Sequence, residues 1–185
     1  MGMVPQGGLF VPEKIPTISL EKLYSWTNLT YPQLAYNIFK LFLRDDFSDQ
    51  EIKYLVEQAY RKDNFNIAEI IPFIKLDDQL FIMELFHGPT GAFKDIALQA
   101  LPLILSLVRK KLSIRNQILI LVATSGDTGK AALEGFKNTE GMQVVVYYPF
   151  QKVSRIQELQ MLTTEGDNTH VLALEGNFDD CQNAV

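Results

Sequence analysis

The chain has 185 residues, of which 47% are hydrophobic and 21% are charged, and its formal net charge is −5. This composition is typical of a folded globular protein and excludes a disordered or fibrous chain. The 17 lysines and arginines are dispersed, which argues against nucleic acid or an anionic membrane surface as a partner. One cysteine and two histidines exclude a disulfide framework and a zinc cluster, and favour a reducing, cytoplasmic location. No segment reaches the roughly 20 apolar residues of a membrane span.

Helical patterns dominate the sequence before Pro72, after a glycine- and proline-rich segment at 1–12 that we expect to be a loop. Residues 31–43 predict a helix whose buried face consists of Leu34, Ile38, Leu41 and Phe42. Residues 48–61 predict a second helix, which begins with the capping-box pair Ser48 and Glu51. Its expected buried stripe consists of Ile52, Leu55, Val56 and Ala59. We expect two antiparallel helices in a small helical N-terminal subdomain, residues 1–78.

Strand and helix patterns alternate after Pro72. The predicted strands are 80–85, 117–123, 143–148 and 170–174, and the predicted helices are 92–112, 128–138 and 154–164. The run 118–122 is continuously apolar, as in a strand buried on both faces of a parallel sheet. The alternation predicts an α/β fold for residues 79–185, with an open, mainly parallel sheet and flanking helices. Such sheets bind ligands at their strand-to-helix turns.

The first candidate turn, residues 86–95, contains two glycines and a proline and leads to Lys94 in the first turn of a predicted helix. The positive end of a helix dipole disfavours a cation, which favours the uncharged amine that acts as a nucleophile. The alternative is an ordinary solvated lysine. The two histidines, His87 and His170, and Cys181 are expected to be structural.

The second candidate turn contains Thr124, Ser125, Gly126, Asp127 and Thr128 directly after the most apolar strand. Small hydroxyl residues and glycine at a helix N-terminus present donors to a carboxylate or phosphate. The alternative is a helix cap by Asp127 or Thr128. A nucleotide-binding P-loop is excluded, because the positions of its first glycine and its magnesium-binding hydroxyl are not matched.

The third candidate turn, residues 151–158, follows the predicted strand 143–148. Lys152 and Ser154, with Arg155 and Gln157, could bind a phosphate there. A solvated helix start is the alternative.

Five blocks of residues, at 7–12, 87–95, 124–129, 152–158 and 175–182, occur in one order along the chain. On these blocks the chain resembles the N-terminal portion of the threonine synthase family, pyridoxal-phosphate enzymes of the tryptophan-synthase-beta-like fold type II. Asp127 favours this family over cysteine synthases, which have asparagine there. The resemblance implies a fold type II domain that is incomplete at 79–185, because the family's cradle for the cofactor phosphate lies further along its chain.

The resemblance also implies roles for single residues. Lys94 matches the lysine that forms the internal aldimine with pyridoxal 5'-phosphate, and Asp127 matches a residue beside that cofactor. The residues that match the cup for the substrate carboxylate are Thr124, Ser125, Gly126, Asp127 and Thr128. Lys152 and Ser154 match a region that helps to hold the substrate phosphate. The implied reaction converts O-phospho-L-homoserine and water to L-threonine and phosphate.

Two other functions stay open at this point. A related lyase, of the cysteine synthase or threonine dehydratase type, shares part of the second turn. A non-catalytic remnant that binds a partner or a small anion is compatible with the absent cofactor cradle. On the threonine synthase reading we expect the chain alone to be catalytically poor, and to self-associate through the apolar flank that later elements of the family would cover.

Overall fold

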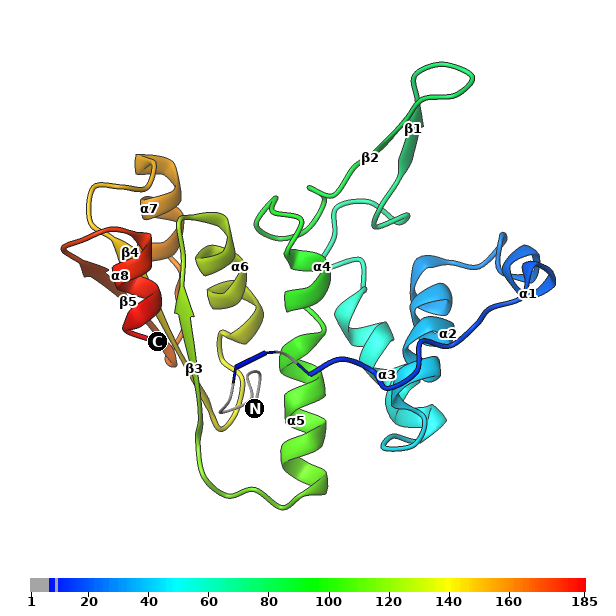
Figure 1. Cartoon of the computed structure of the whole chain (residues 1–185), viewed down its shortest axis with the longest axis horizontal. Coiled ribbons are helices and arrows are strands. Elements are labelled where there is room, and N and C mark those ends of the chain that lie inside the picture. Colours follow the sequence, from blue (N-terminus) through cyan, green and yellow to red (C-terminus); the bar gives the residue numbers. More distant parts are fainter. Residues whose placement is uncertain (1–6, 9) are drawn as a thin grey trace.

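The computed structural model describes residues 7–8 and 10–185 (Figure 1). Residues 1–6 and 9, about half of the expected loop at 1–12, lie outside the described residues. A long helix, α5 (Leu101–Lys111), runs between a group of helices on one side and a parallel sheet on the other (Figure 1). This α/β arrangement with a helical N-terminal part confirms the predicted fold class. In the described part of the chain, no helix is both long enough and apolar enough to cross a membrane.

The N-terminal helices begin where the sequence supplies capping residues. They are α1 (Leu20–Ser25), α2 (Tyr31–Leu43) and α3 (Asp49–Ala59). At the start of α3, the Ser48 N–H donates to the Glu51 carboxylate at 2.7 Å, and the Glu51 N–H donates to the Ser48 hydroxyl at 3.3 Å. The predicted capping box is confirmed, and all four residues of the predicted α3 stripe are buried.

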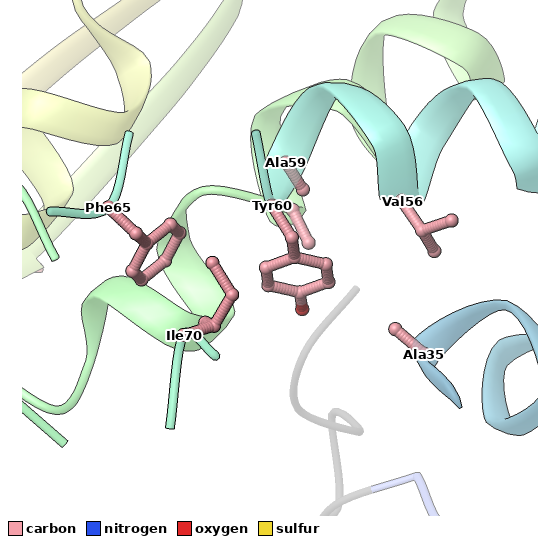
Figure 2. Packing of buried hydrophobic residues seen from close by; sticks show 7 residues of the cluster. Ala35, Val56, Ala59, Tyr60, Phe65 and Ile70 are labelled. Atoms are coloured by element: carbon pink, nitrogen blue, oxygen red, sulfur yellow. The ribbon is translucent and has the colours of Figure 1, made fainter. Parts of the chain in front are cut away.

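The buried face of α2 differs from the predicted one. Ala35 is buried, and Tyr31 and Phe39 pack against the same cluster, whereas Phe42 of the predicted face is 48% exposed. The residues of α2 that pack, Tyr31, Ala35 and Phe39, follow one another at intervals of four. The ring centroid of Tyr31 lies 4.9 Å from that of Tyr60 in the same cluster. Figure 2 shows the Tyr60 ring at the centre of this cluster, between the α2 side and the loop that follows α3.

Residues 72–84 form an antiparallel hairpin that projects from the molecule (Figure 1). β1 (Phe73–Lys75) pairs with β2 (Phe81–Met83), and Asp77 closes the turn by accepting from two backbone N–H groups at 2.8 Å. The strand expected at 80–85 was therefore wrongly assigned to the parallel sheet. Its partner is the neighbouring segment β1, which the sequence analysis did not predict.

The helix expected at 92–112 is two helices, α4 (Asp95–Leu98) and α5. Pro102 has no N–H to donate to the carbonyl of Leu98, four residues earlier, so the α-helical ladder breaks between them. Pro102 instead occupies the first turn of α5, where a proline is tolerated. The break leaves α4 as a separate short helix directly after Lys94.

The main sheet has three parallel strands in the order β3 (Ile118–Ala123), β4 (Met142–Pro149), β5 (Thr169–Leu174). The connections are α6 (Asp127–Phe136) and α7 (Arg155–Leu162), and α8 (Phe178–Asn183) follows β5. One face of β4 is buried against α6 and α7, through Val144, Val146, Leu133, Phe136 and Met161. Because the three strands are parallel, their C-terminal ends lie together, and the turns into α6 and α7 therefore lie at the same end of the sheet.

Strand β3 is less buried than the sequence predicted. Leu119 is 56% exposed, although the apolar run predicted burial on both faces. The register places Leu119 opposite Gln143 and Leu172 opposite Tyr147, so Leu119 and Leu172 lie on the same face of the sheet. Leu172 is 47% exposed, and this face is thus only partly covered.

Candidate functional site

Lys94 lies at the end of the first candidate turn. It is the N-cap residue of α4, rather than a residue in the first turn of a long helix as predicted. Its Nζ lies 4.6 Å from the centre of the Phe93 ring, and Phe93 is 58% exposed. Lys94 itself is half-buried, and its amine lies against an aromatic face.

A buried carboxylate organises the turn in front of Lys94. Asp95 is fully buried, and its two oxygens accept from the N–H and the hydroxyl of Thr90, both at 2.8 Å. Burial raises the pKa of Asp95, while the two bonds from Thr90 act to lower it. A side chain at Gly88 would come within 2.5 Å of Asp95, so the backbone can approach this closely only because residue 88 is glycine. Asp95 thus fixes the path of residues 88–94.

The same turn is anchored to the segment after α3 at both of its ends. The Asn66 N–H donates to the carbonyl of His87 at 3.0 Å, before the turn. The His87 ring lies between the Asn66 amide oxygen at 2.8 Å and the Glu84 carboxylate at 2.7 Å. After the turn, the Tyr60 hydroxyl donates to the carbonyl of Ile96 at 3.0 Å. The expected structural role of His87 agrees with these contacts.

The second candidate turn is held from inside by Thr124. Its buried hydroxyl accepts from the N–H of Gly126 at 3.0 Å and of Gly129 at 2.9 Å, and it donates to the Gly126 carbonyl at 3.1 Å. Gly126 has φ +148°, a conformation that side chains rarely permit. Thr124 is therefore a buried support of the turn, and its hydroxyl is not directed to a ligand.

The outer side of this turn presents donors. Among the described residues, none accepts a hydrogen bond from the backbone N–H of Ser125, Asp127 or Thr128. These groups lie at the N-terminus of α6, where the helix dipole favours an anion. These N–H groups are donors of the kind that a carboxylate accepts from, and the carboxylate site itself stays a prediction. The Asp127 carboxylate cannot join this donor set, because a carboxylate only accepts, and here it accepts from the Gln157 amide at 2.8 Å.

The third candidate turn caps α7. The Ser154 hydroxyl donates to Gln157 Oε1 at 2.9 Å and accepts from the Gln157 N–H at 3.3 Å. The Ser154 N–H also donates to Gln157 Oε1, at 3.3 Å. Both donors of Ser154 are thus used within the helix cap, whereas the side chain of Lys152 is exposed. Of the two predicted residues, Lys152 is the one whose donor faces solvent.

A hollow of about 760 Å³ brings the first two turns together. Lys94 and Thr128 both line it, and much of the remaining wall is aromatic, from Tyr31, Tyr60 and Phe93. A smaller space of about 80 Å³ lies between residues 90–92 and Asp127. Lys152 and Ser154 do not line either space, and Ser154 is linked to the second turn through Gln157. In the described residues, no group of three acidic, histidine or cysteine side chains could hold a metal ion.

The roles of three residues of this site were not predicted from the sequence. Thr90 and Asp95 were not expected to bond to one another, and Gln157 was considered only as a phosphate ligand. For Thr90 and Asp95 the available signal was the density of small residues around Gly88. For Gln157 no signal existed, because its partner Asp127 is 30 residues away.

Comparisons with known proteins give matches to threonine synthases. Residues 1–60 match the family described as "Threonine synthase N terminus". The threonine synthase of Pseudomonas aeruginosa is 41% identical over 184 residues, which cover 100% of this chain and 38% of that protein. The crystal structure of PLP-bound threonine synthase from Brucella melitensis superposes with a TM-score of 0.88 at 34% identity, over 98% of this chain and 38% of that one. Threonine synthase from yeast gives a TM-score of 0.88 at 35% identity, with the same coverage. The chain thus spans less than two fifths of the length of these relatives, and it is similar to the N-terminal portion of threonine synthases.

Proposed function

We propose that the chain supplies the lysine and one wall of the active site of a pyridoxal-phosphate-dependent threonine synthase, which converts O-phospho-L-homoserine and water to L-threonine and phosphate. The observation that carries this proposal is the hollow that Lys94 and Thr128 line together. Residues 1–78 would form the N-terminal subdomain of that enzyme, and residues 79–185 the first part of its cofactor domain.

The described residues suit the cofactor in their chemistry. A lysine amine can bond an aldehyde carbon, and the aromatic side chains beside Lys94 offer an apolar wall for a flat ring. The cofactor, when bound, would supply the electron sink that stabilises a carbanion. Lys94 would hold it, and Asp127 would lie near it and contribute through its backbone N–H, since its carboxylate is bound by Gln157.

The chain's own groups divide the remaining work. The Lys94 amine, once free, would carry protons at Cα and Cβ of the substrate. The N–H groups of Ser125, Asp127 and Thr128 would bind the substrate carboxylate, in a turn that Thr124 and Gly126 shape. Lys152 would attract the substrate phosphate. Ser154 would support Lys152 by capping α7, and its hydroxyl would have to turn away from Gln157 to meet the phosphate itself.

The test is covalent labelling of Lys94. The full chain is incubated with pyridoxal phosphate, reduced with borohydride and mapped by peptide mass spectrometry. We expect stoichiometric label on Lys94, and none on that peptide in Lys94→Ala. Lys75→Ala is the matched control, because Lys75 is an exposed lysine of the hairpin. Label spread evenly over exposed lysines, with Lys94 no more reactive than Lys75, would overturn the assignment of Lys94.

A substrate panel tests the reaction. The chain is fused to the C-terminal part of a related threonine synthase. Turnover of the fusion protein is then measured with O-phospho-L-homoserine, O-acetylserine and threonine. Threonine synthase activity requires turnover of the first. Preference for either of the others would show a related lyase instead, and labelling of Lys94 without any turnover would favour a non-catalytic binding module.

A further inference from the structure

We infer that Gln157 is a positioning residue that fixes the second and third turns of the site at one spacing. This inference rests on the proposed function for its consequence, because that function assigns the substrate carboxylate to the turn at 124–128 and the substrate phosphate to the turn at 152–154. A substrate with one anionic group at each end would bind best when the distance between its two groups matches the distance between the two turns.

Gln157 bonds to both turns with one amide group. Its oxygen accepts from the Ser154 N–H and hydroxyl, and its nitrogen donates to Asp127 Oδ1 at 2.8 Å. The partners fix which end of the amide is which, because a backbone N–H can only donate and a carboxylate can only accept. Van der Waals contact adds to this link, since a side chain at Gly126 would come within 2.4 Å of the Gln157 amide.

A capping box does not by itself require an amide. At the start of α3 the same position is occupied by a carboxylate, Glu51, which accepts from Ser48 in the same way. A glutamate at 157 would cap α7 equally well, but it would place a second carboxylate beside Asp127. The requirement for glutamine therefore comes from the link to the other turn and not from the helix.

Four variants distinguish the link from the helix cap. Gln157→Glu keeps the cap of α7 and breaks the link, because neither carboxylate can donate. Adding Asp127→Asn restores a donor, since the asparagine amide can donate to the new glutamate. Ser154→Ala weakens the cap but leaves the donor for Asp127 in place. Gln182→Glu introduces the same charge on an exposed residue of α8 and serves as the control.

Amide hydrogen exchange in the full chain, without ligand, measures the link. For Gln157→Glu we expect exchange of the Gly126 and Gly129 N–H groups, which donate to Thr124, to accelerate roughly five- to tenfold, the factor for losing one hydrogen bond. The double variant should return to within about twofold of the wild-type chain, and Gln182→Glu should not differ from it. Acceleration that persists in the double variant, or none in Gln157→Glu, would overturn the inference.

Binding of O-phospho-L-homoserine, followed by NMR titration, separates this inference from the proposed function. If the wild-type chain binds it and Gln157→Glu binds at least fivefold more weakly, both are supported. If the wild-type chain does not bind it while the exchange pattern holds, the proposed function fails and the link stands. If binding is equal in both chains, the link does not set the spacing.

Discussion

Asp95 is the residue on which the shape of the lysine turn depends most directly. Its carboxylate is buried beside a position where only glycine fits, and it holds Thr90 by two hydrogen bonds. A buried carboxylate is costly unless its oxygens are hydrogen-bonded, and here both are. Thr90 therefore matters as much as Asp95, although neither reaches the hollow beside Lys94.

The pH dependence of stability should reveal this burial. Because the pKa of Asp95 is raised above its ordinary 3.8 in the folded chain, the contribution of Asp95 to stability is fully present below pH 3.8 and is lost as the pH rises through the folded-state value. Relative to Asp95→Asn, the wild-type chain should therefore lose stability as the pH rises. Urea unfolding of both chains between pH 3 and pH 7 measures this difference, and a difference that does not change with pH would contradict it.

A second variant addresses the hydrogen bond itself. Thr90→Val removes the hydroxyl that donates to Asp95 and keeps the side-chain shape. At neutral pH it should lower the free energy of unfolding by about 1.5–3 kcal/mol, the range for a hydrogen bond to a charged group. Thr139→Val, outside the site, is the control in the same urea titration.

Among the helices and strands, the sequence correctly predicted those that are marked by patterns of neighbouring residues. The box of Ser48 and Glu51 fixes the start of α3, and the apolar runs locate β3 and β4. The hairpin was missed because its strands are only three residues each, too short for a period to show. Pro102 marks the break in the sequence, but the apolar run around it led to the prediction of one continuous helix. The three candidate turns were predicted from local patterns in the same way. The link through Gln157 was not predicted, because a contact between residues 30 positions apart produces no periodic pattern.

Glu51 gives a prediction at this scale, because it joins α3 to the end of α5. Lys111 Nζ lies 2.9 Å from both carboxylate oxygens. Together with the Ser48 donors, this pair lowers the pKa of Glu51 to about 2. The stability it contributes is present above the ordinary value of 4.5 and is lost as the pH falls towards 2.

Glu51→Gln should therefore melt at a lower temperature than the wild-type chain at pH 7, and the two should converge as the pH approaches 2. Circular dichroism melts over this range provide the measurement. Glu57→Gln, whose lysine partner lies 3.9 Å away, should show a smaller difference. Equal effects of the two variants at pH 7 would argue against a special role for the contact with Lys111.

For the whole molecule, the exposed face of the sheet dominates the expected behaviour in solution. Leu119 and Leu172 lie on it, and contiguous apolar surface favours association. We propose that the isolated chain self-associates through this face. Light scattering over a range of concentrations should show a rising mass for the wild-type chain and a lower mass for Leu119→Lys. Leu112→Lys, at an exposed leucine beside α5, should behave like the wild-type chain, and a wild-type monomer at every concentration would refute the proposal.

The anchors of the lysine turn have a mechanical consequence. Tyr60 and Asn66 hold the turn on either side of Lys94, and Tyr60 belongs to the core that packs α2 against α3 (Figure 2). The turn is thus attached to the helical N-terminal part at two points, the carbonyls of His87 and Ile96. A displacement of Tyr60 or Asn66 would therefore change the path of the turn that leads to Lys94. The position of the Lys94 amine therefore depends in part on Tyr60 and Asn66, which lie about 30 residues earlier in the chain.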